Sequence, residues 1–246
     1  MPEATVVFVP GFMQRSDAWA PVAERVSERY PTVCLDFRSH SFEPRLGEIR
    51  EATAAGDALV GYSMGGRLAL HLALREPERL HALAVVGTSG GLDDDAERAR
   101  RLEQDERLAE WMERTPIEHI VAAWERQPIF ATQSPELVES QRAGRLSNDP
   151  RLLALLLRSA GQAALPPIWD RLGDLDVPLV AVAGELDERY LSRARRLALL
   201  APRAEPRVVF GAGHAAHLEQ PDAFAELLLE FLDQHLGQGL VVDGDA

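Results

Sequence analysis

The sequence predicts an α/β fold: helices cover both faces of a mostly parallel central sheet, and an all-helical cap is inserted into it. Short apolar runs that are typical of buried strands alternate with runs of helical periodicity towards both ends of the chain. Between residues 92 and 165, strand-like runs are almost absent and prolines separate several helical segments. A Gly-x-Ser-x-Gly pattern at residues 61–65 lies where a strand-like run meets a helical one.

The first half of the core is predicted to consist of alternating strands and helices. The apolar run Val6–Val9 ends at a Pro-Gly pair, which favours a buried strand followed by a loop. Later strands are assigned on the same grounds, and helices on the helical spacing of their apolar residues. The expected elements before residue 92 are strands at 6–9, 32–37, 58–60 and 80–86, and helices from 16, at 46–55 and at 68–75.

The alternation of strands and helices resumes after residue 165. Strands are expected at 177–183 and 207–210, and helices at 192–200 and 221–236. The helical segment between the two halves lies where a cap over a pocket would sit. We therefore expect an α/β core made of residues 1–91 and 166–246 and a helical cap, or lid, made of residues 92–165.

The Gly-x-Ser-x-Gly pattern predicts a nucleophile elbow with Ser63 at its tip. Such a turn is strained and places the serine hydroxyl outside the sheet, so small residues must flank it. The N–H groups at the start of the following helix can stabilise negative charge beside the serine. The alternative, for so short a pattern, is a glycine-rich turn with an incidental serine.

Three side chains suited to acid–base chemistry follow the ends of expected strands: Ser63, Asp187 and His214. Catalytic groups of open α/β sheets gather at that edge. An imidazole can take the serine proton because its pKa lies near neutrality, and a carboxylate can fix the histidine tautomer. We therefore expect these three residues to be catalytic.

Two of these assignments have competitors. An ordinary turn aspartate is the alternative at position 187, while Asp174 and Asp176 precede the strand and so belong to its opposite end. His214 competes with His217, which we expect to pack or to hydrogen-bond locally. The histidine pair also raises the possibility of a metal site, but no nearby cysteine or carboxylate completes a ligand set. No metal and no cofactor is therefore expected.

An oxyanion hole is expected from two backbone N–H groups. One belongs to Met64, directly after the serine, and the other to Phe12, in the loop after the first strand. For Phe12 the alternative is a side chain that only packs.

Composition limits the partners and the compartment. The net charge of −13 argues against nucleic acid, and no apolar run approaches the ~18 residues of a membrane span. The single cysteine, Cys34, is expected to be a buried core thiol, and the first residues lack a signal-peptide profile. We therefore expect a cytoplasmic enzyme with a small-molecule substrate. An anionic substrate would need a local arginine cluster to reverse the overall field. The sequence leaves the oligomeric state open.

Four segments resemble the α/β-hydrolase superfamily and, within it, the menaquinone-pathway family of 2-succinyl-6-hydroxy-2,4-cyclohexadiene-1-carboxylate synthases. They are residues 61–69, the cap segment 123–131, the turn 184–187 and residues 212–219. The resemblance implies an α/β-hydrolase fold and a lyase that eliminates pyruvate with a serine–histidine–aspartate triad. It also implies that the serine acts as the base rather than forming an acyl-enzyme.

The resemblance further implies that arginines in the pocket bind the carboxylates of the substrate. A planar guanidinium suits this role because it can hold a carboxylate through two hydrogen bonds. Arg67 follows Ser63 by about one helical turn and can therefore reach the pocket. The alternative for each arginine is a solvated side chain. The implied substrate-binding residues are Tyr62, Arg67, Arg101, Trp124 and Arg145.

Two loops depart from the family pattern. Pro10 stands where the family has a histidine, and residues 38–41 replace a Pro-Gly-His-Gly segment. Both loops are expected to border the site, so they bear on the substrate more than on the fold or the triad. The main alternative function is a carboxylesterase-like serine hydrolase of a small ester or acyl compound, with Ser63 as nucleophile. A non-catalytic ligand-binding protein is the third reading.

Overall fold

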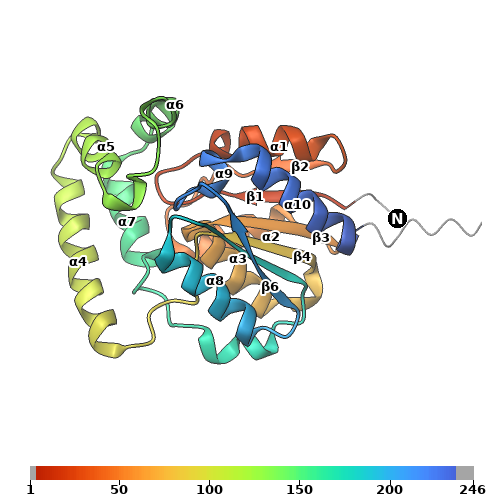
Figure 1. The fold of residues 1–246 in the computed structure, drawn as a ribbon. Helices are drawn as coiled ribbons and strands as arrows, with labels where there is room; N and C mark the ends of the chain where they lie inside the picture. The colour runs from red at the N-terminus through yellow and green to blue at the C-terminus, as the bar shows by residue number, and fades with distance from the viewer. Residues whose placement is uncertain (1–3, 237–246) are drawn as a thin grey trace, which may run out of the picture.

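A six-stranded parallel sheet forms the centre of the molecule in the computed structural model, which describes residues 4–236 (Figure 1). The strand order is β2-β1-β3-β4-β5-β6, and every neighbouring pair is parallel. Parallel neighbours need crossover connections, and helices supply them here. The strands are β1 (Val6–Val9), β2 (Thr32–Cys34), β3 (Asp57–Tyr62), β4 (Leu80–Val86), β5 (Leu179–Gly184) and β6 (Ala204–Val209).

Helices pack on both faces of the sheet. One core cluster joins α2, α3 and α8 to the sheet, and a second joins α1, α9 and α10 to its other face. None of the helices within residues 4–236 is both long enough and apolar enough to cross a membrane. The α-helices on the sheet are α1 (Ala20–Ser27), α2 (Phe42–Ala52), α3 (Met64–Arg75), α8 (Glu188–Leu200), α9 (Ala216–Glu219) and α10 (Pro221–Leu236), and the 3-10 helices near them are η1 (Ser16–Trp19), η2 (Pro77–Arg79) and η4 (Trp169–Asp174).

The helices between β4 and β5 gather at one end of the molecule, beside the sheet (Figure 1). They have a small apolar core of their own, in which Met112, Ile120 and Leu153 are buried together with Met13 from the loop after β1. The division into core and cap at residues 91 and 165 stays our prediction. The helices of this segment are α4 (Asp95–Glu113), α5 (Ile117–Glu125), α6 (Pro135–Leu146) and α7 (Pro150–Ala160), with the 3-10 helix η3 (Pro128–Phe130).

The observed elements differ from the predicted ones mainly at their ends. Helices α2, α3 and α8 each begin one turn before the predicted start, because their first turns hold polar residues or glycine and lack apolar periodicity. Strand β2 ends at Cys34, three residues early. The prediction of a fully buried Cys34 was wrong: β2 is a short edge strand, so the thiol is only partly buried, and that burial raises its pKa to about 11.

Candidate active site

Ser63 occupies a strained turn between β3 and α3. Its backbone has φ +49° and ψ −108°, a conformation that costs a residue other than glycine about 1–3 kcal/mol. Two hydrogen bonds hold the turn: the Ser63 N–H donates to the Val86 carbonyl oxygen (2.9 Å), and the Thr88 hydroxyl donates to the Ser63 carbonyl oxygen (2.8 Å). The end of β4 thus fixes the elbow, and Ser63 lines the cavity described below.

Gly65 lets the start of α3 approach the end of β1. A Cβ atom at this position would lie 2.4 Å from the Val9 carbonyl oxygen, far inside van der Waals contact. The close approach places the first residue of α3, Met64, beside the loop that carries Phe12, and both residues line the same cavity. Their role as oxyanion-hole donors stays a prediction, which this placement makes geometrically reasonable.

The structure brings the three predicted catalytic side chains together. His214 Nδ1 lies 2.8 Å from Asp187 Oδ2, and His214 Nε2 lies 3.4 Å from Ser63 Oγ. The second distance is long for a hydrogen bond, as it often is in enzymes without substrate. The rival Asp174 lies in η4, before β5 begins, whereas Asp187 follows β5.

Two residues to which the sequence assigned no role hold this arrangement. Glu219 accepts hydrogen bonds from the backbone N–H groups of Gly213 (2.7 Å) and Ala215 (3.0 Å), on either side of His214. Tyr190 donates its backbone N–H to the free oxygen of Asp187 (3.2 Å), and its ring packs 4.4 Å from that of His214. Glu219 lies in residues 212–219, one of the segments that resemble the family. That resemblance is the sequence signal that could have identified it.

His217 packs below the site. Its fully buried ring stacks between Trp19 and Tyr62, with centroids 4.3 and 4.4 Å away, and within residues 4–236 neither ring nitrogen has a hydrogen-bond partner. Burial, and to a smaller extent the nearby His214, lower the pKa of His217 from 6.5 to about 3. His217 is therefore neutral at pH 7.

We expect His217→Phe to reduce the acid sensitivity of the fold. Between about pH 3 and 6.5 the unfolded chain binds a proton at His217 that the folded chain does not, so stability falls on acidification. This term removes about 2 kcal/mol between pH 7 and pH 5. Urea unfolding at both pH values should show the smaller loss in the variant. The exposed His81, changed to Gln, is the control, and equal losses in wild type and His217→Phe would contradict the expectation.

A cavity of about 550 Å³ opens beside Ser63, between the carboxyl edge of the sheet and the helices that follow β4. Tyr62 is buried against His214, and burial raises the pKa of its phenol. Trp124 packs against Phe12, at 5.3 Å between ring centroids. The cavity is lined by all ten predicted site residues, namely Phe12, Tyr62, Ser63, Met64, Arg67, Arg101, Trp124, Arg145, Asp187 and His214, and by others that include Gln133, Gln162, Arg189 and Tyr190.

Arg67 is a buried cation, and the alternative prediction of a solvated side chain was wrong. The residue is 7% exposed, and burial lowers its pKa. One Nη2 hydrogen bond reaches the Ala160 carbonyl oxygen (3.0 Å), and Nε has no partner within residues 4–236. The Asp105 carboxylate is near enough to act on the charge of Arg67, but it forms no hydrogen bond with it. A buried guanidinium with so few partners is costly unless a ligand supplies a carboxylate.

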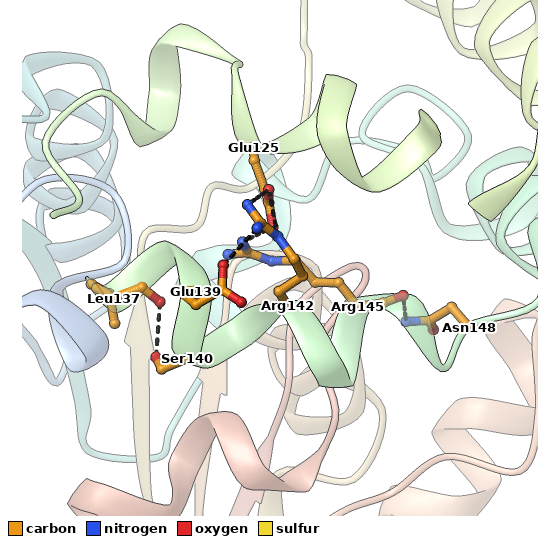
Figure 2. Close-up of polar contacts among 7 residues, drawn as sticks. All are labelled: Glu125, Leu137, Glu139, Ser140, Arg142, Arg145 and Asn148. Carbon is orange, nitrogen blue, oxygen red and sulfur yellow. Dashed lines mark hydrogen bonds and ion pairs between the residues drawn. The ribbon is translucent and has the colours of Figure 1, made fainter. Parts of the chain in front are cut away.

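The other two predicted arginines are each held by a buried carboxylate. Arg101 Nε donates to Asp105 Oδ1 (2.7 Å), and its Nη1 donates to Gln162 Oε1 (2.9 Å). Arg145 Nη1 donates to Glu125 Oε1 (3.1 Å), as Figure 2 shows. Sequence reasoning missed both acids, although Glu125 directly follows Trp124 in a segment that carries the family resemblance.

Only one of the two loops that depart from the family pattern borders this cavity. The loop after β1 lines it through Phe12 and Gln14, as expected, although Pro10 itself does not. Residues 38–41 do not line it, contrary to our expectation. His40 instead lines a separate cavity of about 140 Å³. Strand β2 is short, so the chain leaves the sheet before it reaches the site, and residues 38–41 therefore lie away from the cavity.

Known proteins are similar to this chain in fold and in sequence. The profile of the alpha/beta hydrolase family matches residues 6–227. The structure of MenH from S. aureus superposes with a TM-score of 0.89, at 28% identity over 94% of each chain. A thermophilic esterase from Thermogutta terrifontis has a TM-score of 0.80 at 22% identity over 94% of this chain and 90% of that one, a likeness of fold alone.

Two curated relatives carry the name of one enzyme. The 2-succinyl-6-hydroxy-2,4-cyclohexadiene-1-carboxylate synthase of Enterobacter sp. (strain 638) is 32% identical over 92% of this chain and 91% of that protein. A Bacillus subtilis (strain 168) protein, provisionally named for the same synthase, is 37% identical over 71% of this chain, a match that spans 65% of the relative. The chain therefore belongs to the alpha/beta hydrolase family and, within it, to the family of 2-succinyl-6-hydroxy-2,4-cyclohexadiene-1-carboxylate synthases.

Proposed function

We propose that this protein eliminates pyruvate from 2-succinyl-5-enolpyruvyl-6-hydroxy-3-cyclohexene-1-carboxylate and leaves 2-succinyl-6-hydroxy-2,4-cyclohexadiene-1-carboxylate. The observation that carries the proposal is Arg67, a buried cation that lines the same cavity as Ser63 and that no carboxylate within residues 4–236 contacts by a hydrogen bond. Membership of the synthase family supports it. The substrate is a small anion, and the cytoplasmic location expected from the sequence is part of the proposal.

The names of substrate and product define the chemistry. The ring double bond at C3 becomes a diene at C2 and C4, so the C2 proton and the C5 oxygen substituent are lost together. The C2 proton is adjacent to the succinyl ketone, which makes it acidic. The electrons of the C–H bond move through the ring and expel the enolate of pyruvate, which takes up a proton and becomes pyruvate.

The triad supplies the base for this step. His214 accepts the Ser63 proton, Asp187 stabilises the imidazolium, and the Ser63 oxygen removes the C2 proton. Negative charge that develops on the ketone oxygen is stabilised by the N–H groups of Met64 and Phe12. The C2 proton stays on the Ser63 oxygen, and the His214 imidazolium gives its proton to the pyruvate enolate, so the triad ends the cycle unchanged.

The three arginines match the carboxylates of this substrate in number. The compound carries three carboxylates, on the succinyl arm, on the ring and on the enolpyruvyl group, and Arg67, Arg101 and Arg145 line the cavity. Such a concentration of guanidinium groups supplies carboxylate-binding donors within a protein whose net charge is −13. Pyruvate release from the purified enolpyruvyl compound, followed by a coupled lactate dehydrogenase assay, tests the proposal. Absence of release at micromolar enzyme would contradict it.

Arg67→Ala should raise KM for the anionic substrate at least about tenfold, because the variant loses a buried charge-assisted contact. The rate with a neutral ester such as p-nitrophenyl acetate, if there is any turnover, should change much less. Steady-state kinetics with both compounds measures the difference. Arg98→Ala, which removes an arginine of α4 outside the cavity lining, is the matched control. Equal effects on both compounds would exclude a carboxylate-binding role for Arg67.

Hydrolysis by the same triad is the second candidate function, because the strained Ser63 and the Asp187–His214 pair also suit an acyl transfer. A fluorophosphonate probe that labels wild type but not Ser63→Ala would reveal a reactive serine in either case. Rapid turnover of neutral esters that survives Arg67→Ala, without pyruvate release, would favour the hydrolase.

A further inference from the structure

Glu125 and Arg142 form a charge cluster behind one wall of the cavity, in which the Glu125 carboxylate is buried and Arg142 is partly exposed. Glu125 ends α5 and has a side chain only 6% exposed. It accepts hydrogen bonds from two residues of α6: Arg142 through Nη2 and Nε (2.7 and 3.2 Å to Oε2), and Arg145 through Nη1 (3.1 Å to Oε1). Figure 2 shows both guanidinium groups converging on the one carboxylate. Neither Glu125 nor Arg142 lines the cavity, whereas Arg145 does.

The two arginines stand in different surroundings. The Arg145 side chain is 4% exposed and donates one hydrogen bond to the cluster, so most of its guanidinium is left for the cavity. The Arg142 side chain is 41% exposed and contacts both oxygens of Glu125. Arg142 also pairs with Glu139, but that side chain is 67% exposed and its charge is screened by water.

A charge count shows what this arrangement achieves. One carboxylate beside Arg145 alone would make a neutral pair, and the pair would present little field to a bound anion. The second guanidinium gives Glu125 and its two arginines together a net charge of one positive unit, because the Glu139 carboxylate beyond them is largely in water. We propose that Glu125 and Arg142 are positioning residues for Arg145: Glu125 fixes its guanidinium at the cavity wall, and Arg142 neutralises Glu125 so that Arg145 keeps its charge for a substrate carboxylate. The inference rests on the proposed function in one respect, that the substrate is a carboxylate anion.

The test is a double-mutant cycle of Glu125→Gln and Arg142→Gln. Arg142→Gln leaves Glu125 and Arg145 as a neutral pair, so KM should rise about tenfold while kcat stays within about twofold. Glu125→Gln removes the negative charge while its amide oxygen can still accept from Arg145, so KM should equal or fall below that of wild type. The double variant restores the wild-type net charge, and its KM should return to within about twofold of wild type.

A purely structural role for the cluster predicts a different order. If the two residues only hold the helices together, each single change should weaken the site and the double variant should be at least as impaired as Arg142→Gln. That order would overturn the proposal. Glu139→Gln and the exposed neighbour Arg126→Gln are matched controls, and both should leave KM unchanged.

Binding of succinate, measured by calorimetry in the same variants, separates this inference from the proposed function. If wild type releases no pyruvate, the proposed function fails, but the order of succinate affinities still tests the cluster. The expected order places Arg142→Gln weakest and the double variant close to wild type. Equal succinate affinity in all four proteins would also overturn the proposal. So would the absence of succinate binding to wild type at about 10 mM.

Discussion

Ser63→Ala, His214→Ala and Asp187→Asn should each lower kcat by about 10³-fold or more, the largest effects expected for this protein. Ser63→Ala removes the base, His214→Ala removes the group that accepts the serine proton, and Asp187→Asn favours the wrong imidazole tautomer. Because His214 lies between the other two, at 2.8 Å from Asp187 and 3.4 Å from Ser63, the three side chains act as one unit. Single-turnover rates of pyruvate release measure each loss.

The losses should also be far from additive. Ser63→Ala combined with His214→Ala should be no slower than the worse single variant, within about a factor of three. Asp174→Asn is the matched control for Asp187→Asn, since Asp174 is exposed and lies before β5, and it should keep the wild-type rate. Losses that multiply, or an Asp174→Asn defect equal to that of Asp187→Asn, would reject the triad.

Gly184→Ala should cause the second largest loss. Gly184 ends β5, and a Cβ atom there would lie 2.1 Å from the Gly213 carbonyl oxygen and 2.3 Å from that of Ala212. Both contacts are with backbone, so the strand end and the His214 loop must separate. A displacement of about 1 Å would break the Asp187–His214 hydrogen bond and lower kcat by about 10²-fold.

The unfolding free energy of Gly184→Ala should fall by about 1–3 kcal/mol through overpacking, as chemical denaturation would measure. Gly47→Ala is the matched control. Gly47 lies in α2, and a Cβ atom there would have no neighbour within 4 Å, so that variant should keep its activity and gain stability if it changes at all. A Gly184→Ala enzyme with wild-type kcat would show that the two loops can move without disturbing the triad.

The positions of the three predicted triad residues could be inferred from the sequence because they depend only on which residues follow the strands. Ser63, Asp187 and His214 each follow a strand, and parallel strands place their carboxyl ends at one edge whatever their order in the sheet. The family resemblance then selected Arg67, Arg101 and Arg145, all of which line the cavity. Neither step required the register of the strands or the exact ends of the helices.

The features that could not be predicted depend on long-range packing. The start of α3 at Met64 requires Gly65 to pack against the end of β1, so the intrinsic helix preference of the glycines gave no signal. The partial exposure of Cys34 follows from the edge position of β2, which one strand's sequence does not reveal. The pairing of Glu125 with two arginines of α6 likewise depends on how two helices meet.

The sheet order also determines when the site can be completed during synthesis. Strands β4 and β5 are neighbours, yet residues 87–178 separate them in the chain. As the chain leaves the ribosome, β1 to β4 are available first, and the open edge of β4 must wait for a partner while the four helices between are made. Unpaired strand edges invite wrong association, and the small apolar core of these helices can form in that interval. The acid and the base follow β5 and β6, so Ser63 gains its partners only when the last strands have joined the sheet.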